Sequence, residues 1–589
     1  MKLCALDFES WVDNECSLKK LPLDAYIRHP AWHVYMISVW DEKGLVHVGA
    51  PTAEARALLS GYDGYIAHNI SFERAVLRRL DWTECLEGKT WVDTADLAVY
   101  FQVGRSLRWA QTFLLPDIPP KMELNLAAPK EFDAEGFWKG QSADNESIRE
   151  YCAHDSELSW LLWTRWGHLW PAIERRISQV NAEAGDLGVL IDWPLLAKMK
   201  EEASRIAREA KAAIPYTPAL SLLKLKIQCQ KEGILPPAST SQANPDFTRW
   251  LDDHHERVPW VRQLQRFRKA NRFAKIFQTM ERMRREDDTI ASRLLYYGAE
   301  LTGRFAGTAG LNFQNFNREA WNEIDPRAVI VPRPGYKLAI ADLSQIEPRC
   351  LNWLAGNMKF FDFVRQYGSV YVAAGMAWEI LKSPDECSGP KKQLIKALVL
   401  GCGYGAGAIT FQRVAKTYGI ELTIVEAEER VNFFRTRSPE IVGYWYKLLR
   451  EFERAGRTHK TRLPSGRILR YRNIRRARDV DDETGEKTEL LADTRLDAHN
   501  MTRGIWHGKL CENVVSGCAR DVFCEAVVRL ADMGFRILFT AHDEVVAEVP
   551  EAAAEKHLAV MISELSRTPA WLPGIVLGAE GSIEERYLK

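Results

Sequence analysis

Two apolar runs near the end of the chain are separated by only three polar residues. The runs are Ile537–Ala541 and Val545–Val549, and the residues between them are His542, Asp543 and Glu544. Runs joined this closely predict an antiparallel hairpin with the polar residues at its tip. A third apolar run, Tyr336–Ala341, ends directly before Asp342 and also predicts a strand. The chain is therefore expected to place carboxylates at the ends of separate strands.

The first 165 residues alternate between short apolar runs and helical patterns. Leu3–Phe8 and Gly64–Ala67 predict strands, and helices are expected from about Ser71 and over Ser147–Trp166. Such alternation favours an α/β domain. Residues 195–290 are instead strongly helical. The 589 residues leave room for roughly three or four domains of ~150 residues each.

Charge and cysteine content narrow the class of protein. Lys+Arg and Asp+Glu both number 79, so a surface for a polyanion must come from local clusters such as Arg262–Arg285 and Arg462–Arg478. The 11 cysteines include no Cys-x-x-Cys pair, which argues against a disulfide framework or a zinc ribbon. No apolar run reaches the roughly 18 residues of a membrane span, and the N-terminus does not read as a signal peptide. We expect a soluble protein of the cytoplasm without membrane contact.

Asp342 and Asp543 predict metal chemistry if the fold brings them together. Transfer of a phosphoryl group needs two divalent ions about 3.5–4 Å apart, which clamp the attacking and leaving oxygens. Lys392 and Lys396 are four residues apart on a predicted helix, so they share a face and can neutralise a triphosphate. Alone, an acid after a strand is usually a turn residue and a lysine pair is usually a solvated face. The order and spacing of the segments make the combination specific.

A second group of acids lies in the N-terminal part. Asp7 and Glu9 are two apart on a strand, so both project from one face. Tyr151 and Asp155 are four apart on a helix and also share a face. His68–Glu73 lies between these pairs in the chain. Converging acids build a two-metal hydrolysis site, in which a tyrosine hydroxyl can orient the attacking water.

The C-terminal segments resemble the family A DNA polymerases. Their motif A is similar to Asp342–Arg349, motif B to the helix with Lys396, Gly401, Tyr404 and Gly405, and motif C to His542, Asp543 and Glu544. Segments that precede motif A in the family resemble Gly188–Asp192, Thr302–Phe305 and Asn312–Asn315. The resemblance covers about residues 170–589, and it implies template-directed DNA synthesis from dNTPs.

The resemblance implies a role for each matching residue. Asp342 and Asp543 would ligate two Mg²⁺ ions, for which Mn²⁺ can substitute, and Glu544 would support that site. Lys392, Lys396, Leu400 and Tyr404 would line the nucleotide pocket, and Glu347 would exclude a ribose 2′-OH. Arg304 would reach the minor groove, where every base pair presents acceptors. His542 and Gln314 would also contact DNA.

Residues 1–165 resemble the DEDD 3′→5′ proofreading exonucleases of the tyrosine type. Asp7, Glu9, Asp155 and Glu73 would hold two further metal ions, Asn69 would contact DNA and Tyr151 would take part in catalysis. The implied fold is an α/β, RNase H-like exonuclease domain followed by an α+β right-hand polymerase over 166–589. The thumb is expected at about 195–290, the palm at about 291–370 and 500–589, and the fingers at about 371–499.

Three positions depart from the family patterns. Lys392 stands where Arg is usual, and lysine cannot grip phosphate bidentately. Leu400 stands where Phe or Tyr is usual, which predicts unusual handling of dideoxynucleotides. Glu73 stands where Asp is usual, so one metal ligand is expected to shift. Preference for a modified base, as some phages use, is a further hypothesis for the pocket of Lys392 and Leu400.

The architecture leaves several interpretations open. The chain begins at the exonuclease domain with nothing like a 5′ nuclease, which suits a replicative phage or plasmid enzyme, acting as a monomer in the host cytoplasm. Its partners would be primer–template DNA, dNTPs and a processivity factor or helicase/primase. Alternatives are a single-subunit RNA polymerase, a decayed polymerase kept as a DNA-binding module, and an exonuclease whose C-terminal half only grips DNA. Glu347 argues against the first, and the retained acids and motif B argue against the others.

Overall fold

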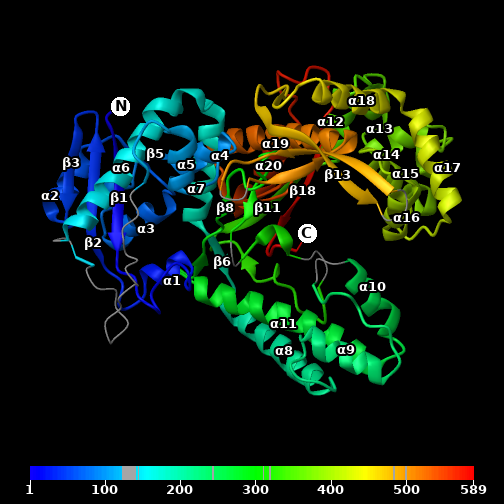
Figure 1. Cartoon of the computed structure of the whole chain (residues 1–589), viewed down its shortest axis with the longest axis horizontal. Helices are drawn as coiled ribbons and strands as arrows, with labels where there is room; N and C mark the ends of the chain where they lie inside the picture. Colours follow the sequence, from blue (N-terminus) through cyan, green and yellow to red (C-terminus); the bar gives the residue numbers. More distant parts are fainter. Residues whose placement is uncertain are drawn as a thin grey trace.

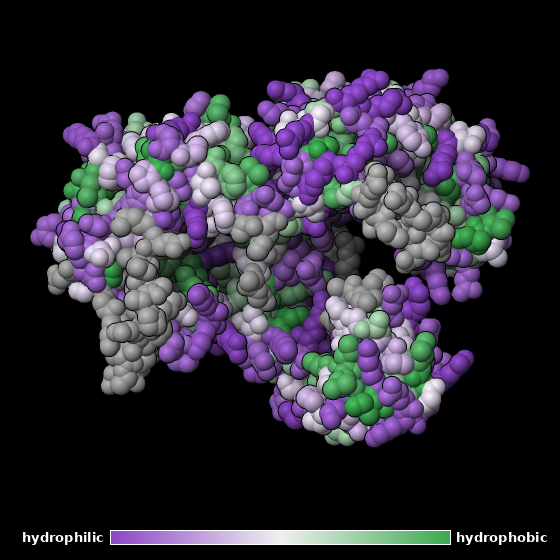
Figure 2. Space-filling view, viewed as in Figure 1, coloured by the Kyte–Doolittle hydropathy of each residue, from purple (hydrophilic) through white to green (hydrophobic). Residues whose placement is uncertain are grey.

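The computed structural model describes the chain except for residues 122–140, 143–144, 242–244, 309–310, 317–319, 482–484, 498–499 and 589. In Figure 1 the N-terminal part lies beside a central sheet, helices α13–α18 (residues 360–453) lie beyond that sheet, and helices α8–α11 (residues 193–283) form a separate lower arm. Figure 2 shows the surface hollowed between this lower arm and the mass above it. The molecule therefore has an open cleft along one side of its central sheet.

The N-terminal part is built on a mixed five-stranded sheet in the order β3-β2-β1-β4-β5. Its strands are β1 (Leu3–Ser10), β2 (Val34–Asp41), β3 (Gly44–Gly49), β4 (Gly64–Ala67) and β5 (Thr90–Asp93). The parallel pairs are β1–β4 and β4–β5, and β1–β2 and β2–β3 are antiparallel. The helices of this part are α1 (Leu23–Ile27), α2 (Ala53–Ser60), α3 (Ser71–Arg79), α4 (Thr94–Tyr100), α5 (Leu107–Leu114) and α6 (Glu146–Trp166). The α/β alternation predicted from the sequence is present.

The lower arm is helical, as expected for 195–290. It follows α7 (Ala172–Leu187) and β6 (Val189–Ile191), and its helices are α8 (Trp193–Ala212), α9 (Leu222–Lys231), α10 (Pro245–His254) and α11 (Pro259–Met283). Helix α11 buries Val261, Leu264, Phe267, Phe273 and Phe277, which recur at helical spacing. Packing of that face against α8 leaves the arginines of α11 for the other side.

A four-stranded sheet in the order β16-β17-β11-β18 forms the centre of the molecule. Its strands are β11 (Tyr336–Leu343), β16 (Arg536–Ala541), β17 (Glu544–Pro550) and β18 (Ala579–Glu584), with α12 (Ile346–Leu354), α19 (His507–Asp532) and α20 (Ala554–Leu565) nearby. Alternate residues of β11 enter different cores. Ala339, Ala341 and Leu343 join the large core shared with α4–α6 and α12–α19, whereas Leu338 and Ile340 join the core of α8–α11. The sheet is thus buried on both faces.

Two further groups of elements complete the chain. The helices are α13 (Phe360–Tyr367), α14 (Val370–Ala377), α15 (Gly389–Cys402), α16 (Ala408–Thr417), α17 (Ile424–Arg437) and α18 (Pro439–Glu453). A four-stranded sheet follows, made of β12 (His459–Arg462), β13 (Ile468–Asp481), β14 (Gly485–Asp493) and β15 (Thr502–Ile505). Two small sheets join β6, β7 (Thr289–Ile290) and β10 (Ile330–Val331), and β8 (Leu294–Leu295) and β9 (Ala306–Gly307).

All 11 cysteines are free, in agreement with the absence of a disulfide pattern. Among the described residues no helix has the length and apolar character needed to cross a membrane. The sequence pattern predicts a helix over Cys511–Met533 that ends before Gly534. The observed helix, α19, instead begins at His507 and ends at Asp532, and Gly534 (φ +88°) follows its end. A residue with positive φ commonly stops a helix in this way.

Candidate active sites

The ends of β11 and the β16–β17 hairpin bring the predicted polymerase acids together. Asp342 lies opposite Glu544 in the register of β11 and β17, and Leu343 N donates to Asp543 O at 3.1 Å. His542 (φ +60°) forms the turn with Asp543. Adjacent strands in this sheet therefore carry Asp342 and Asp543 to the same edge.

Glu544 does not lie at the hairpin tip as predicted. It is the first residue of β17, is 6% exposed and accepts a hydrogen bond from Tyr587 Oη at 2.6 Å. The turn is shorter than the sequence suggested because strand pairing continues to Ala541 and Glu544. Glu544 is thus held inside the sheet beside the two acids.

The loop after Asp342 is held by buried contacts. Gln345 has φ +52° and accepts a hydrogen bond from Val370 N through its side chain at 3.0 Å. Arg349 is 2% exposed and donates to the carbonyl oxygens of Ser344, Val576 and Gly368 at 2.8, 2.6 and 2.9 Å. Burial lowers the pKa of Arg349 to about 10. The arginine of the motif A segment therefore supports the loop rather than facing the cleft.

Glu347 is the centre of a contact group that joins four segments. Tyr404 Oη donates to Glu347 Oε2 at 2.9 Å, and Ser516 Oγ on α19 donates to Glu347 Oε1 at 3.0 Å. Arg304 forms an ion pair with the same carboxylate. Burial raises the pKa of Tyr404, so its phenol remains a hydrogen-bond donor. The sequence did not single out Ser516, and nothing in its helical pattern marks it.

Helix α15 presents the predicted nucleotide-binding residues. Ile395, Ala397 and Leu398 are fully buried, which leaves Lys392 and Leu400 exposed, the latter by 41%. Lys396 Nζ lies 5.6 Å from the centre of the Tyr371 ring. Gly405 (φ +78°) follows Tyr404, and a Cβ there would lie 2.5 Å from His507. The helix thus turns its polar and exposed side away from the core, as its spacing predicts.

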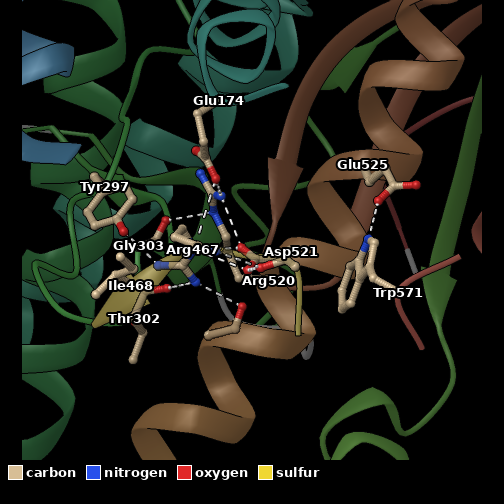
Figure 3. A network of polar contacts seen from close by, with 12 residues as sticks. Glu174, Tyr297, Thr302, Gly303, Arg467, Ile468, Arg520, Asp521, Glu525 and Trp571 are labelled. Carbon is tan, nitrogen blue, oxygen red and sulfur yellow. Dashed lines mark hydrogen bonds and ion pairs between the residues drawn. The ribbon is translucent and has the colours of Figure 1, made fainter. Parts of the chain in front are cut away.

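A buried cluster of four charges fixes the segment that precedes Arg304. Figure 3 shows Arg467 and Arg520 between Glu174 of α7 and Asp521 of α19. Arg520 Nη1 lies 2.5 Å from Glu174 Oε1, and Arg467 Nε lies 2.8 Å from Asp521 Oδ1. The guanidinium groups also donate to main-chain and phenol oxygens, those of Tyr297, Thr302, Gly303 and Gly517. Because Gly303 has φ +77° and a Cβ there would lie 2.8 Å from Arg467 Nη1, glycine is required at this turn.

The N-terminal sheet and α6 bring the second group of acids together. One carboxylate oxygen from each of Asp7 and Glu9 and the Sγ of Cys152 lie within 4.8 Å of one another. Burial and the neighbouring Asp155 raise the pKa of Asp7 to about 8. Burial, Asp7 and Asp155 raise the pKa of Glu9 well above its usual range. Burial and Asp155 raise the pKa of Tyr151, so its hydroxyl stays protonated.

Glu73 reaches this site from the first turn of α3, and Asn69 reaches it from the turn between β4 and α3. Glu73 is 2% exposed, its Oε2 has no hydrogen-bond partner, and burial and Asp7 raise its pKa. A cavity of about 540 Å³ is lined by Asp7, Glu9, Asn69 and Glu73. A second cavity, of about 860 Å³, shares Asn69 and reaches Arg282 of α11. The second cavity therefore lies between the acid site and the base of the lower arm.

Two residues of this site were not predicted from the sequence. Cys152 donates to Asp7 Oδ2 at 3.5 Å. Lys121 forms an ion pair with Asp155, and its Nζ lies 4.5 Å from the centre of the Tyr151 ring. Cys152 stands one residue after Tyr151, so its proximity could have been inferred from the helix. Lys121 lies far from the motifs in sequence, and only the fold brings it close.

The donors of the N-terminal site fit divalent metal ions. Clustered carboxylates raise one another's pKa because like charges are crowded together, and Asp155 Oδ1 and Glu73 Oε2 are buried without hydrogen-bond partners. Oxygen ligands of this kind are those that Mg²⁺ prefers, and a buried carboxylate without a partner is costly unless a cation joins it.

Comparison with known proteins identifies the chain. The family model for DNA polymerase family A matches residues 199–587. The chain belongs to DNA polymerase family A. It is accordingly a DNA-directed DNA polymerase, and the family expected from the C-terminal motifs is confirmed.

Individual relatives agree with this family. The DNA polymerase of Bacillus phage SP02 is 26% identical over 505 residues, 75% of each chain. The thermostable DNA polymerase I of Thermus filiformis is 24% identical over 416 residues, 68% of this chain and 45% of that one. The polymerase domain of Pol1 from M. smegmatis, solved with DNA primer-template and dNTP, has a TM-score of 0.70 and 17% identity, and the match covers 99% of this chain and 95% of that one. The last match shows that the fold is shared.

Proposed function

We propose that this family A polymerase extends primers by a two-metal mechanism at Asp342 and Asp543. The observation that carries the proposal is the pairing of β11 with β17, which brings these two acids to one sheet edge. Two Mg²⁺ ions, when bound there, would activate the primer 3′-OH and neutralise charge on the triphosphate. Glu544 would support the acids, and Lys392 and Lys396 would bind the triphosphate from α15.

The contacts of Glu347 support a role in sugar selection. A carboxylate held by Tyr404 and Ser516 is fixed in position, so it would exclude a ribose 2′-OH from the nucleotide pocket. Arg304, which pairs with Glu347, would exchange this partner for minor-groove acceptors. His542 and Gln314 would contact the primer–template from the hairpin turn and from the 3₁₀ turn Phe313–Asn315.

We further propose that the N-terminal part is an RNase H-like proofreading exonuclease. Asp7, Glu9, Asp155 and Glu73 would hold the metal ions, and Tyr151 would orient the attacking water. Asn69 would bind the primer end. The 860 Å³ cavity between this site and α11 supports the proposal, since a frayed primer needs a path to the acids.

The domain boundaries follow from these assignments. Helices α8–α11 would form the thumb, the central sheet with α12 and α19 the palm, and α14–α18 the fingers. A replicative role is supported by the similarity to a phage DNA polymerase along three quarters of both chains.

Primer extension tests the two sites together. A labelled primer–template with Mg²⁺ and dNTPs would be incubated with wild type, Asp543→Ala and Asp7→Ala. We expect wild type to extend, Asp543→Ala to fail, and Asp7→Ala to extend but leave a mismatched 3′ end untrimmed. If wild type only degrades the primer, the polymerase assignment fails. If Asp7→Ala trims as wild type does, the exonuclease assignment fails.

A further inference from the structure

A basic sheet lies outside all of the polymerase motifs. Strands β12–β15 are inserted between α18 and α19. Its strands carry nine cations against five acids. The cations are Lys460, Arg462, Arg470, Arg472, Arg475, Arg476, Arg478, Lys487 and Arg503, and the acids are Asp479, Asp481, Glu486, Glu489 and Asp493. In Figure 1 strand β13 extends from the region of α19 toward α15–α17. The net positive charge of this sheet contrasts with the zero net charge of the whole chain.

The base of the sheet is fixed to the N-terminal part by one buried side chain. Gln102 is 1% exposed. Its Nε2 donates to Arg470 O at 3.0 Å and Thr494 O at 2.8 Å, and its Oε1 accepts from Arg470 N at 2.8 Å. Gly104 N adds a hydrogen bond to Leu496 O at 2.8 Å. These hydrogen bonds fix the sheet relative to the N-terminal part, so the positions of its exposed cations are fixed as well.

Strand β15 leads directly to an exposed tryptophan beside Tyr404. Trp506 is 47% exposed although it is large and apolar. A Cβ on Gly508 would lie 2.3 Å from the Trp506 ring and 1.9 Å from the carbonyl oxygen of Tyr404. Glycine at 508 therefore allows the tryptophan ring to lie against the main chain at Tyr404. Arg503 is exposed three residues before the ring and forms no ion pair with any residue that the structure describes.

Aromatic rings next to cations are typical of surfaces that bind single-stranded nucleic acid. Bases stack on the ring, and the cations contact the phosphates without reading sequence. Bases inside a duplex already stack on their neighbours, so an exposed ring such as Trp506 fits the bases of a single strand better. At a polymerase site the template ahead of the primer end is the unpaired strand.

We propose that Trp506 and the cations of β13 and β15 bind the single-stranded template before it reaches Tyr404. This rests on the proposed place of Tyr404 beside the templating base. Trp506 would stack the next unpaired base, and Arg503 would contact its phosphate. Arg475 and Arg476 project from opposite faces of β13, are 40% and 63% exposed, and pair with Asp493 and Glu453. Either arginine would exchange its acid for a phosphate of the template.

The test compares primer–templates that differ only in the length of the template overhang. Fluorescence anisotropy would measure Kd for a 1-nucleotide and a 12-nucleotide 5′ overhang. We expect wild type to bind the long overhang more tightly. Because stacking of one base is worth about 1–3 kcal/mol, Trp506→Ala should weaken binding of the long overhang by roughly 5- to 150-fold. It should leave the short overhang nearly unchanged.

Matched variants separate stacking, charge and folding. Trp506→Phe keeps an aromatic face and should retain most of the overhang effect. The triple change of Arg475, Arg476 and Arg503 to Gln should make the plot of log K against log salt concentration less steep. The slope should decrease in magnitude by about 0.7 for each phosphate that the variant no longer neutralises. Arg56→Gln, on α2 of the N-terminal part and paired with Glu84, removes one exposed cation elsewhere and should change neither value.

Two results would overturn the proposal. One is equal affinity of wild type and Trp506→Ala for the long overhang, with both proteins folded. The other is a loss confined to substrates with a frayed primer 3′ end, which would assign the sheet to the primer strand. Extension of the short-overhang substrate by wild type keeps the polymerase assignment separate, since that activity does not depend on this surface.

Discussion

The buried charges of Arg467, Arg520, Glu174 and Asp521 allow a quantitative prediction. Each of the four residues is at most 7% exposed, and the two positive and two negative charges cancel. Arg467→Met keeps an apolar stem of similar length but leaves a net negative charge in the core. Removing one partner of a buried ionic group costs roughly 3–5 kcal/mol. The carbonyl oxygens of Thr302 and Gly517 also lose a donor, so the upper part of this range is expected.

Thermal unfolding followed by circular dichroism measures this loss. At about 2–4 °C per kcal/mol for a unit of 150–250 residues, the expected decrease in Tm is roughly 6–20 °C. Arg205→Met is the matched control, because Arg205 pairs with Glu202 and Glu209 on the exposed side of α8. Its expected cost is below about 1 kcal/mol.

A double variant tests whether the charge imbalance is the cause. Arg467→Met combined with Asp521→Asn restores a neutral cluster and should recover part of the lost stability, which appears as a coupling energy in a double-mutant cycle. A decrease in Tm of less than about 2 °C for Arg467→Met, or no recovery in the double variant, would refute the reasoning. Loss of DNA affinity should accompany the lower Tm, since Arg467 holds the turn that carries Arg304.

Four further outcomes are expected. Glu347→Ala removes the carboxylate beside Tyr404 and should increase ribonucleotide relative to deoxynucleotide incorporation by roughly 10- to 200-fold, measured as a ratio of kcat/KM. Leu400→Phe should change dideoxynucleotide incorporation in single-turnover assays, and equal rates in wild type and variant would contradict the role of this exposed position. Lys392→Arg should lower KM for dNTPs up to about tenfold, because one added charged hydrogen bond is worth ~1.5 kcal/mol. Burial lowers the pKa of His68 from its ordinary value of 6.5 to about 3. As pH falls below 6.5 the unfolded chain takes up a proton on this ring but the folded protein does not, so the free energy of unfolding decreases. Between about pH 6.5 and pH 5 the loss is at most about 2 kcal/mol at ~1.36 kcal/mol per pH unit, and His68→Gln should flatten this part of the urea-midpoint profile.

Short-range patterns predicted the strands and helices that carry the acids. Spacing of two along a strand placed Asp7 and Glu9 on one face, and spacing of four along a helix placed Tyr151 and Asp155 together. These periods are properties of the backbone, so they can be read without the fold. Helix α19, which begins at His507 rather than Cys511, shows that the ends of elements depend on their packing.

Long-range contacts could not be predicted in the same way. Lys121 reaches Asp155 and Ser516 reaches Glu347 only because distant segments fold together. Glu544 was placed at the hairpin tip because three polar residues suggested a longer turn, whereas a hydrogen bond from Tyr587, 43 residues away, favours its burial in the strand. Partners at such separation leave no local periodicity in the sequence.

Helix α7 limits how the protein can be divided. Glu174 at its start compensates charge in the core of the C-terminal part, whereas Ser178 Oγ donates to Asp96 at 2.5 Å and Asp186 pairs with Arg78 at 2.6 Å, both in the N-terminal part. A fragment that begins or ends beside this helix would leave charged side chains without the partners that neutralise them in the intact chain. Exchange of the N-terminal part between relatives would therefore require α7 to match both the incoming N-terminal part and the core of the C-terminal part.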